Sequence, residues 1–97
     1  MRLYHWTREE QANAILEQGW RNPGYNAEPN MKPGIWFSED PLDVLRMLGN
    51  DSRIVVEVPD GELSDEWRST LYPTEWVIPA HHLNGWPTTV EPLQRPT

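Results

Sequence analysis

Three side chains in this 97-residue chain are suited to holding a polar ligand and reacting with it: His5, Trp36 and Glu75. An imidazole donates or accepts hydrogen bonds, an indole face attracts cations, and an ionised carboxylate stabilises developing positive charge. Taken singly, each residue has a simpler explanation, as a structural histidine, a core aromatic and a solvated glutamate. A site therefore requires a fold that brings the three together.

The elements around His5 are the most clearly signalled. A short aromatic strand is expected over residues 3–6. Thr7 and Glu10 then match a capping box, in which a Thr hydroxyl and a Glu carboxylate bond the first unpaired amides of a helix. The helix is expected to run to about Gln18. Its apolar stripe and its left-handed end are predicted at Ala12, Ile15, Leu16 and Gly19.

Trp36 follows a long loop. Residues 21–33 contain three prolines and no sustained period, which indicates a loop long enough to have a function. A strand is expected over residues 34–38. A second helix should follow, with Asp40 as its N-cap and Pro41 at its first position. Its predicted buried stripe is Leu42, Val44, Leu45 and Leu48.

The second half of the chain supplies the strand that holds Glu75. The β-branched residues of 53–58 predict a buried strand, and residues 74–78 predict another. Residues 62–73 are ambiguous, and a short edge strand is expected at 88–90. We predict an α+β fold with split, mainly antiparallel sheets and two short helices. It forms one domain, 1–97, of which 92–97 is a loose tail.

Composition narrows the classes of function. The formal net charge of −7, from 15 acidic and 8 basic residues, disfavours a protein that holds nucleic acid by neutralising its phosphates. There is no cysteine, which excludes thiolate chemistry. No apolar run reaches the ~20 residues of a membrane span, and the first residues lack a signal-peptide core. We expect an intracellular, cytoplasmic protein without membrane contact.

Three motifs together resemble the ADP-ribosyltransferase superfamily, in the diphtheria-toxin and PARP-like branch with a His, an aromatic and a Glu on three strands. They appear in the family's order, from residue 3 to about residue 83. The matching pieces are Leu3-Tyr4-His5-Trp6-Thr7 with the helix that follows, Gly34-Ile35-Trp36-Phe37-Ser38, and Glu75-Trp76-Val77-Ile78-Pro79. The resemblance implies an enzyme that moves ADP-ribose from NAD to an acceptor and releases nicotinamide.

The resemblance also implies residue roles. His5 would hold a ribose hydroxyl of NAD, and the backbone of Trp6 and Thr7 would contact the nicotinamide amide. Trp36 would stack on the nicotinamide ring and Ser38 would line the pocket. Glu75 would be the catalytic residue, binding the ribose 2′-hydroxyl and stabilising the cation that forms. No metal site is implied.

The chain departs from the family pattern at two positions. Trp6 stands where the family often has Gly, and Pro73 stands where arginine-modifying members carry a second Glu. The related RNA 2′-phosphotransferase branch fits less well, because the basic residues form no cluster. The alternative function is a non-catalytic acidic module on the same fold that binds a partner or inhibits one.

Overall fold

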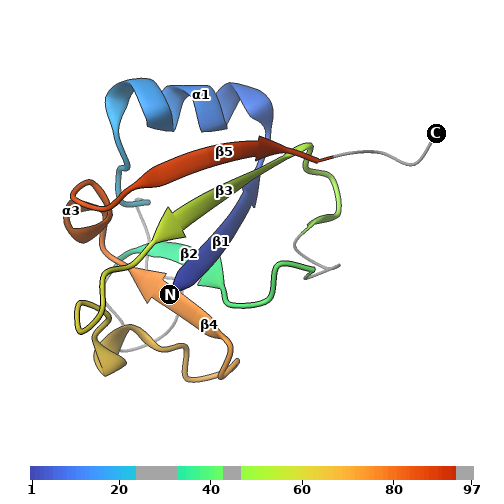
Figure 1. Ribbon diagram of the computed structural model, residues 1–97. Helices are drawn as coiled ribbons and strands as arrows, with labels where there is room; N and C mark the ends of the chain where they lie inside the picture. Colours follow the sequence, from blue (N-terminus) through green and yellow to red (C-terminus); the bar gives the residue numbers. More distant parts are fainter. Residues whose placement is uncertain (24–32, 43–46, 94–97) are drawn as a thin grey trace.

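The computed structural model describes residues 1–23, 33–42 and 47–93. Its centre is a five-stranded antiparallel sheet in the order β4-β2-β1-β3-β5 (Figure 1). The predicted α+β class and antiparallel pairing are confirmed, but the strands form one sheet rather than split sheets. The strands are β1 Arg2–Thr7, β2 Ile35–Ser38, β3 Ser52–Glu57, β4 Glu75–Ile78 and β5 Thr88–Pro92.

The middle strand pair fixes where His5 lies. β3 is rich in β-branched residues, which favour a pleated, buried position, and it pairs with β1 along the whole length of both strands. The register places Leu3 opposite Val56 and His5 opposite Ile54. Leu3, Ile54 and Val56 are completely buried. Because a slip of one residue would expose these side chains, the register of β1 is strongly determined.

Strands β1 and β2 are joined by fewer paired residues than any other neighbouring strands of the sheet. These strands pair only at Tyr4 and Ser38, whereas β2 and β4 pair along all of β2, from Ile35–Ile78 to Ser38–Glu75. The predicted edge strand is β5, which pairs with β3. The single pair between β1 and β2 leaves room for side chains between the two strands beyond it.

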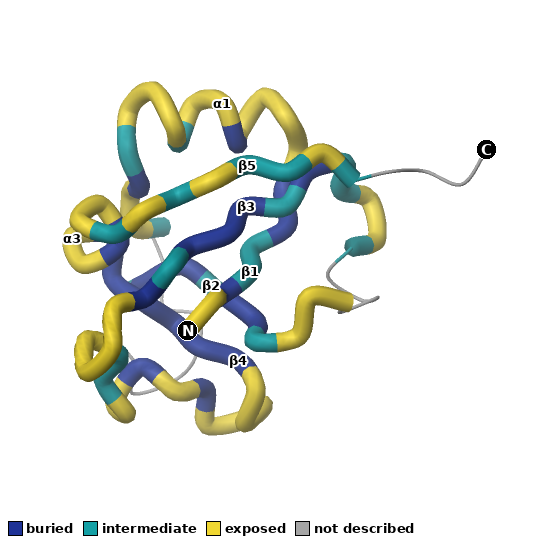
Figure 2. The backbone as a smooth tube through the Cα atoms, viewed as in Figure 1, coloured by how far each residue is buried: buried dark blue, intermediate teal, exposed yellow. Residues whose placement is uncertain are grey.

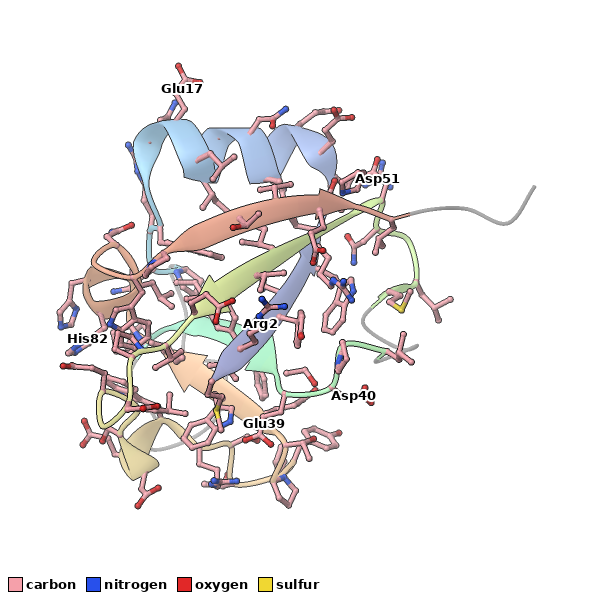
Figure 3. The ribbon with its side chains drawn as sticks, in the orientation of Figure 1. Arg2, Glu17, Glu39, Asp40, Asp51 and His82 are labelled. Atoms are coloured by element: carbon pink, nitrogen blue, oxygen red, sulfur yellow. The ribbon has the colours of Figure 1, made fainter. Side chains whose placement is uncertain are left out.

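Helix α1, Glu9–Gln18, begins differently from the prediction. Its N-cap is Arg8, whose side chain makes no capping hydrogen bond. The amide of Glu9 instead donates to the Asp51 carboxylate at 2.8 Å, and the Thr7 hydroxyl donates to Gln11. Figure 3 shows Asp51 beside the start of α1. The predicted capping box is therefore wrong, because the carboxylate of Asp51, the residue directly before β3, takes its place.

The same helix packs through a narrow stripe. Ala12 is buried and Ile15 packs against the core, whereas Leu16, predicted to belong to the stripe, is exposed. Figure 2 shows α1 mostly exposed above the buried β3. The predicted left-handed end is confirmed at Gly19, whose φ is 85°. Trp20 then turns back into the core.

Two short helices complete the described fold. Residues 62–73, ambiguous in sequence, contain a 3₁₀ helix at Asp65–Trp67, and α3 spans Ala80–Leu83. The buried side chains of Trp67 and Leu83 join the core cluster. No helix within the described ranges is both long enough and apolar enough to cross a membrane.

Residues 43–46 of the second predicted helix lie outside the described residues, and they include Val44 and Leu45 of its predicted stripe. Asp40 accepts a hydrogen bond from the Leu42 amide at 2.8 Å, in the manner of an N-cap. Leu42 and Leu48 are exposed, so their assignment to a buried stripe is wrong. The predicted tail begins within β5, and residues 94–97 are likewise outside the description.

Candidate functional site between β1 and β2

The His5 ring lies where β1 and β2 diverge. Its Nδ1 is 2.7 Å from the carbonyl oxygen of Trp36. Because a carbonyl oxygen only accepts, Nδ1 must carry the proton in this contact. In the neutral ring Nε2 is then the hydrogen-bond acceptor. The contact therefore selects the tautomer of His5 and holds its ring against β2.

A pocket of about 220 Å³ opens at this point. It brings together four of the predicted site residues, His5, Trp6, Trp36 and Ser38. An engineered apolar cavity of ~150 Å³ holds benzene, so this volume suits one substituted ring. Three further residues line it, Tyr4, Leu48 and Asn50. Sequence reasoning did not assign these three to the site, although Tyr4 stands two positions before Trp6 and therefore on the same strand face.

Trp6 fits at its position despite its size. The residue is 7% exposed, and the centroid of its ring lies 6.2 Å from that of the Tyr4 ring. The guanidinium of Arg53 lies 5.0 Å from the centroid of the Tyr4 ring. Arg53 is in turn held by Glu91 and by the Pro41 carbonyl. The wall formed by Tyr4 and Trp6 is thus supported from β3 and β5.

Thr7 does not line the pocket. It is buried, and its hydroxyl donates to Gln11 Oε1 at 2.7 Å. The side chain of Thr7 therefore faces α1 rather than the space beside His5. The predicted contact of its backbone with nicotinamide stays a prediction.

Glu75 lies one strand beyond Ser38. The two residues are directly opposed in the β2–β4 register, and Ser38 is itself opposed to Tyr4. Directly opposed residues share a face, with Cβ atoms about 4.5–5.5 Å apart. Glu75 is only 6% exposed, which is unusual for a glutamate in a strand. The register therefore places the Cβ of Glu75 next to that of Ser38, a lining residue, but Glu75 itself is not among the residues that line the pocket.

A larger groove of about 660 Å³ lies on the α1 side of His5. His5 and Trp36 line both spaces, so these two residues form the boundary between them. The groove is lined on one side by α1, through Gln11, Ala14, Ile15 and Gln18, and on the other by β2. Arg21, just after α1, is its cationic lining residue among those described. The two glutamines follow the i, i+7 spacing of one helix face, a signal present in the sequence.

The remaining polar features lie elsewhere. His81 and His82 are exposed on α3, where Figure 3 labels His82. The His82 ring lies 4.5 Å from that of Trp67. Within the ranges that the structure describes, no group of three or more His, Asp and Glu side chains could hold a metal ion. A hydrogen bond from Arg2 to Glu57, together with their opposite charges, raises the pKa of the Arg2 guanidinium above its usual value. Neither Arg2 nor Glu57 lines a pocket described above.

Comparisons of the chain with protein families, with curated proteins and with solved structures found no match.

Proposed function

We propose that this protein is an NAD-dependent ADP-ribosyltransferase, which moves ADP-ribose from NAD to an acceptor and releases nicotinamide. One observation carries the proposal: His5, Trp36 and Glu75 lie on β1, β2 and β4, which are adjacent strands of the sheet. The pocket lined by His5, Trp36 and Ser38 has the volume of a single ring, and Glu75 is directly opposed to Ser38 in the β2–β4 register. This combination suits a ligand that carries a cationic ring on a sugar.

His5 binds the sugar in this proposal. With Nδ1 bonded to the Trp36 carbonyl, Nε2 of the neutral ring accepts a hydrogen bond from a ribose hydroxyl. The imidazole is held in advance of binding, which lowers the entropic cost of ordering it. Trp36 offers its indole face to the nicotinamide ring, which is a cation while attached to ribose.

Glu75 stabilises the reacting sugar. The bond between ribose C1 and the nicotinamide nitrogen breaks, both electrons leave with nicotinamide, and positive charge develops on the ribose. An ionised carboxylate near C1 stabilises that transition state more than the ground state. An acceptor oxygen or nitrogen then bonds to C1 and loses its proton. Burial of Glu75 strengthens this electrostatic effect, because a site that excludes water screens charge less.

NAD is too large for the first pocket alone. That pocket takes the nicotinamide ring, and the rest of the dinucleotide extends past His5 and Trp36 into the 660 Å³ groove. A groove of this volume lies within the usual range of ligand sites. In this proposal Arg21, which lines the groove, pairs with the pyrophosphate. The position of Pro73 before Glu75 argues against arginine as the acceptor, because the second Glu of arginine-modifying relatives is missing.

Two measurements test the proposal. In the first, NAD is titrated while tryptophan fluorescence is followed. Quenching is expected in the wild type and in Trp86→Ala, whose side chain packs beside Trp67 away from the site, and should be lost in Trp36→Ala. Wild-type fluorescence that does not respond to NAD would favour the non-catalytic acidic module.

The second measurement is nicotinamide release from NAD with water or a cell lysate as acceptor. Glu75→Gln is expected to lower the rate at least ~100-fold, as removal of an electrostatic stabiliser does, while NAD still binds. The far-UV circular dichroism spectrum and melting temperature show whether the variant is folded. A folded Glu75→Gln protein with wild-type turnover would refute the catalytic role.

A further inference from the structure

One face of α1 presents two carboxamides to the groove. Gln11, Ala14, Ile15 and Gln18 all line it, at the i, i+3, i+4, i+7 spacing of a single helix face. With a rise of 1.5 Å per residue, the two glutamines stand about 10 Å apart along the helix. A ligand in the groove therefore meets a polar group at each end of a short apolar stretch.

Gln11 differs from Gln18 in being held by the fold. The Thr7 hydroxyl donates its proton to Gln11 Oε1 at 2.7 Å. Thr7 is 4% exposed, at the end of β1, so its position is set by the strand. Among the described residues, no comparable hydrogen bond holds the side chain of Gln18. The carboxamide nearer the start of α1 is thus oriented before any ligand arrives.

The direction of this hydrogen bond decides which way the amide points. Oε1 of Gln11 faces Thr7, so the two hydrogens of Nε2 point away from it. None of the described residues accepts a hydrogen bond from Gln11 Nε2. An oriented donor at the edge of a groove lined by His5 and Trp36 suits an acceptor oxygen of the ligand.

We propose that Thr7 acts on ligand binding through Gln11, whose Nε2 donates a hydrogen bond to a ribose or phosphate oxygen of NAD in the groove. Thr7 is then a positioning residue and Gln11 a binding residue. This inference rests on the function proposed above. Its physical basis is pre-organisation: a side chain already held in its binding rotamer loses less entropy when the ligand arrives.

The test measures the dissociation constant of NAD, and the KM and kcat of NAD hydrolysis, in five variants. Gln11→Ala is expected to weaken NAD binding about 3- to 10-fold, the effect of losing one hydrogen bond. Thr7→Val, which keeps the shape without the donor, should weaken it about 2- to 4-fold, and Thr7→Ser should stay within about 2-fold of wild type. Gln18→Ala is the matched control on the same helix face, with a smaller effect than Gln11→Ala. KM should rise and kcat should not change.

The double variant Thr7→Val/Gln11→Ala separates positioning from a general structural role. If Thr7 acts through Gln11, the double variant binds NAD within about 2-fold of Gln11→Ala alone. If Thr7→Val weakens NAD binding as strongly in the Gln11→Ala protein as in the wild type, the inference is overturned. Normal NAD binding by Gln11→Ala would also overturn it. If the wild-type protein does not bind NAD, the proposed function is refuted and this inference is refuted with it.

Discussion

Replacing Asp51 by Ala should destabilise the protein by releasing the start of α1. The Asp51 carboxylate accepts a hydrogen bond from the Glu9 amide at 2.8 Å and so does the work of a capping side chain, which the N-cap residue Arg8 does not supply, from 42 residues further along the chain. Loss of such a cap costs about 1 kcal/mol of unfolding free energy. The negative charge near the helix N-terminus contributes about 0.3 kcal/mol more, at the lower end of its range because Glu9 and Glu10 are already there.

The expected loss is therefore about 1–1.5 kcal/mol, or a melting temperature about 5–10 °C lower for a domain of this size. Thermal unfolding followed by far-UV circular dichroism measures it. Hydrogen exchange gives a local readout, because the Glu9 amide should exchange faster in Asp51→Ala than in wild type. Asp51→Asn keeps an acceptor and should lose only a few tenths of a kcal/mol.

Glu10→Ala is the control that distinguishes this cap from a local capping box. If Asp51 caps the helix, Glu10→Ala should change the unfolding free energy by no more than about 0.5 kcal/mol, as surface substitutions usually do. A melting temperature that falls by several degrees in Glu10→Ala and by less than about 1 °C in Asp51→Ala would refute the reasoning. The helix would then be capped by its own residues.

Two further substitutions test the walls of the site. In Gly34→Ala, the added Cβ would lie 2.8 Å from the Ile78 carbonyl carbon and 2.9 Å from its oxygen, so urea denaturation should show a loss of about 1–3 kcal/mol. Gly85→Ala, whose Cβ would have no neighbour closer than 3.7 Å, is its control and should lose less. Asn84→Ala removes the hydrogen bonds from the Trp20 amide (2.7 Å) and to the Trp20 carbonyl (3.2 Å). Asn84→Ala should lower the unfolding free energy by about 1–3 kcal/mol, and Asn84→Asp should lower it by less. Equal stability of Asn84→Ala and wild type would show that these hydrogen bonds do not stabilise the position of Trp20.

Short sequence patterns predicted those structural features that depend only on residues close together in the chain. The β-branched run at 53–58 predicts β3, and Gly19 predicts the end of α1, because each depends on residues close in the chain. The predicted capping box was wrong because the start of α1 depends on a residue that is distant in the chain. Thr7 and Glu10 match the capping-box pattern, but the pairing of β1 with β3 brings the Asp51 carboxylate to the start of the helix. The residues around Thr7 give no indication of this pairing.

Burial of single residues was predicted less well, because it depends on which elements lie opposite. Leu42 and Leu48 have helical spacing with the other leucines of their segment, yet both are exposed. Glu75, in contrast, is buried although its residue type favours exposure. A strand glutamate ordinarily faces water, and its burial follows from a register that sets it against Ser38. Sequence reasoning therefore selected the site residues by resemblance, while their proximity depends on strand order.

His5 has a structural role as well as the proposed binding role, and this affects how its variants are interpreted. Continuing the β1–β2 register beyond Tyr4 and Ser38 would set Trp6 opposite Trp36, but the strands pair no further. Beyond that point the His5 ring supplies a donor to the Trp36 carbonyl. Loss of NAD binding in His5→Ala would follow equally from a lost ligand contact or from a shifted β2. Trp36 and Glu75 separate these causes better, because removing either side chain leaves the contact between the His5 ring and the Trp36 backbone in place.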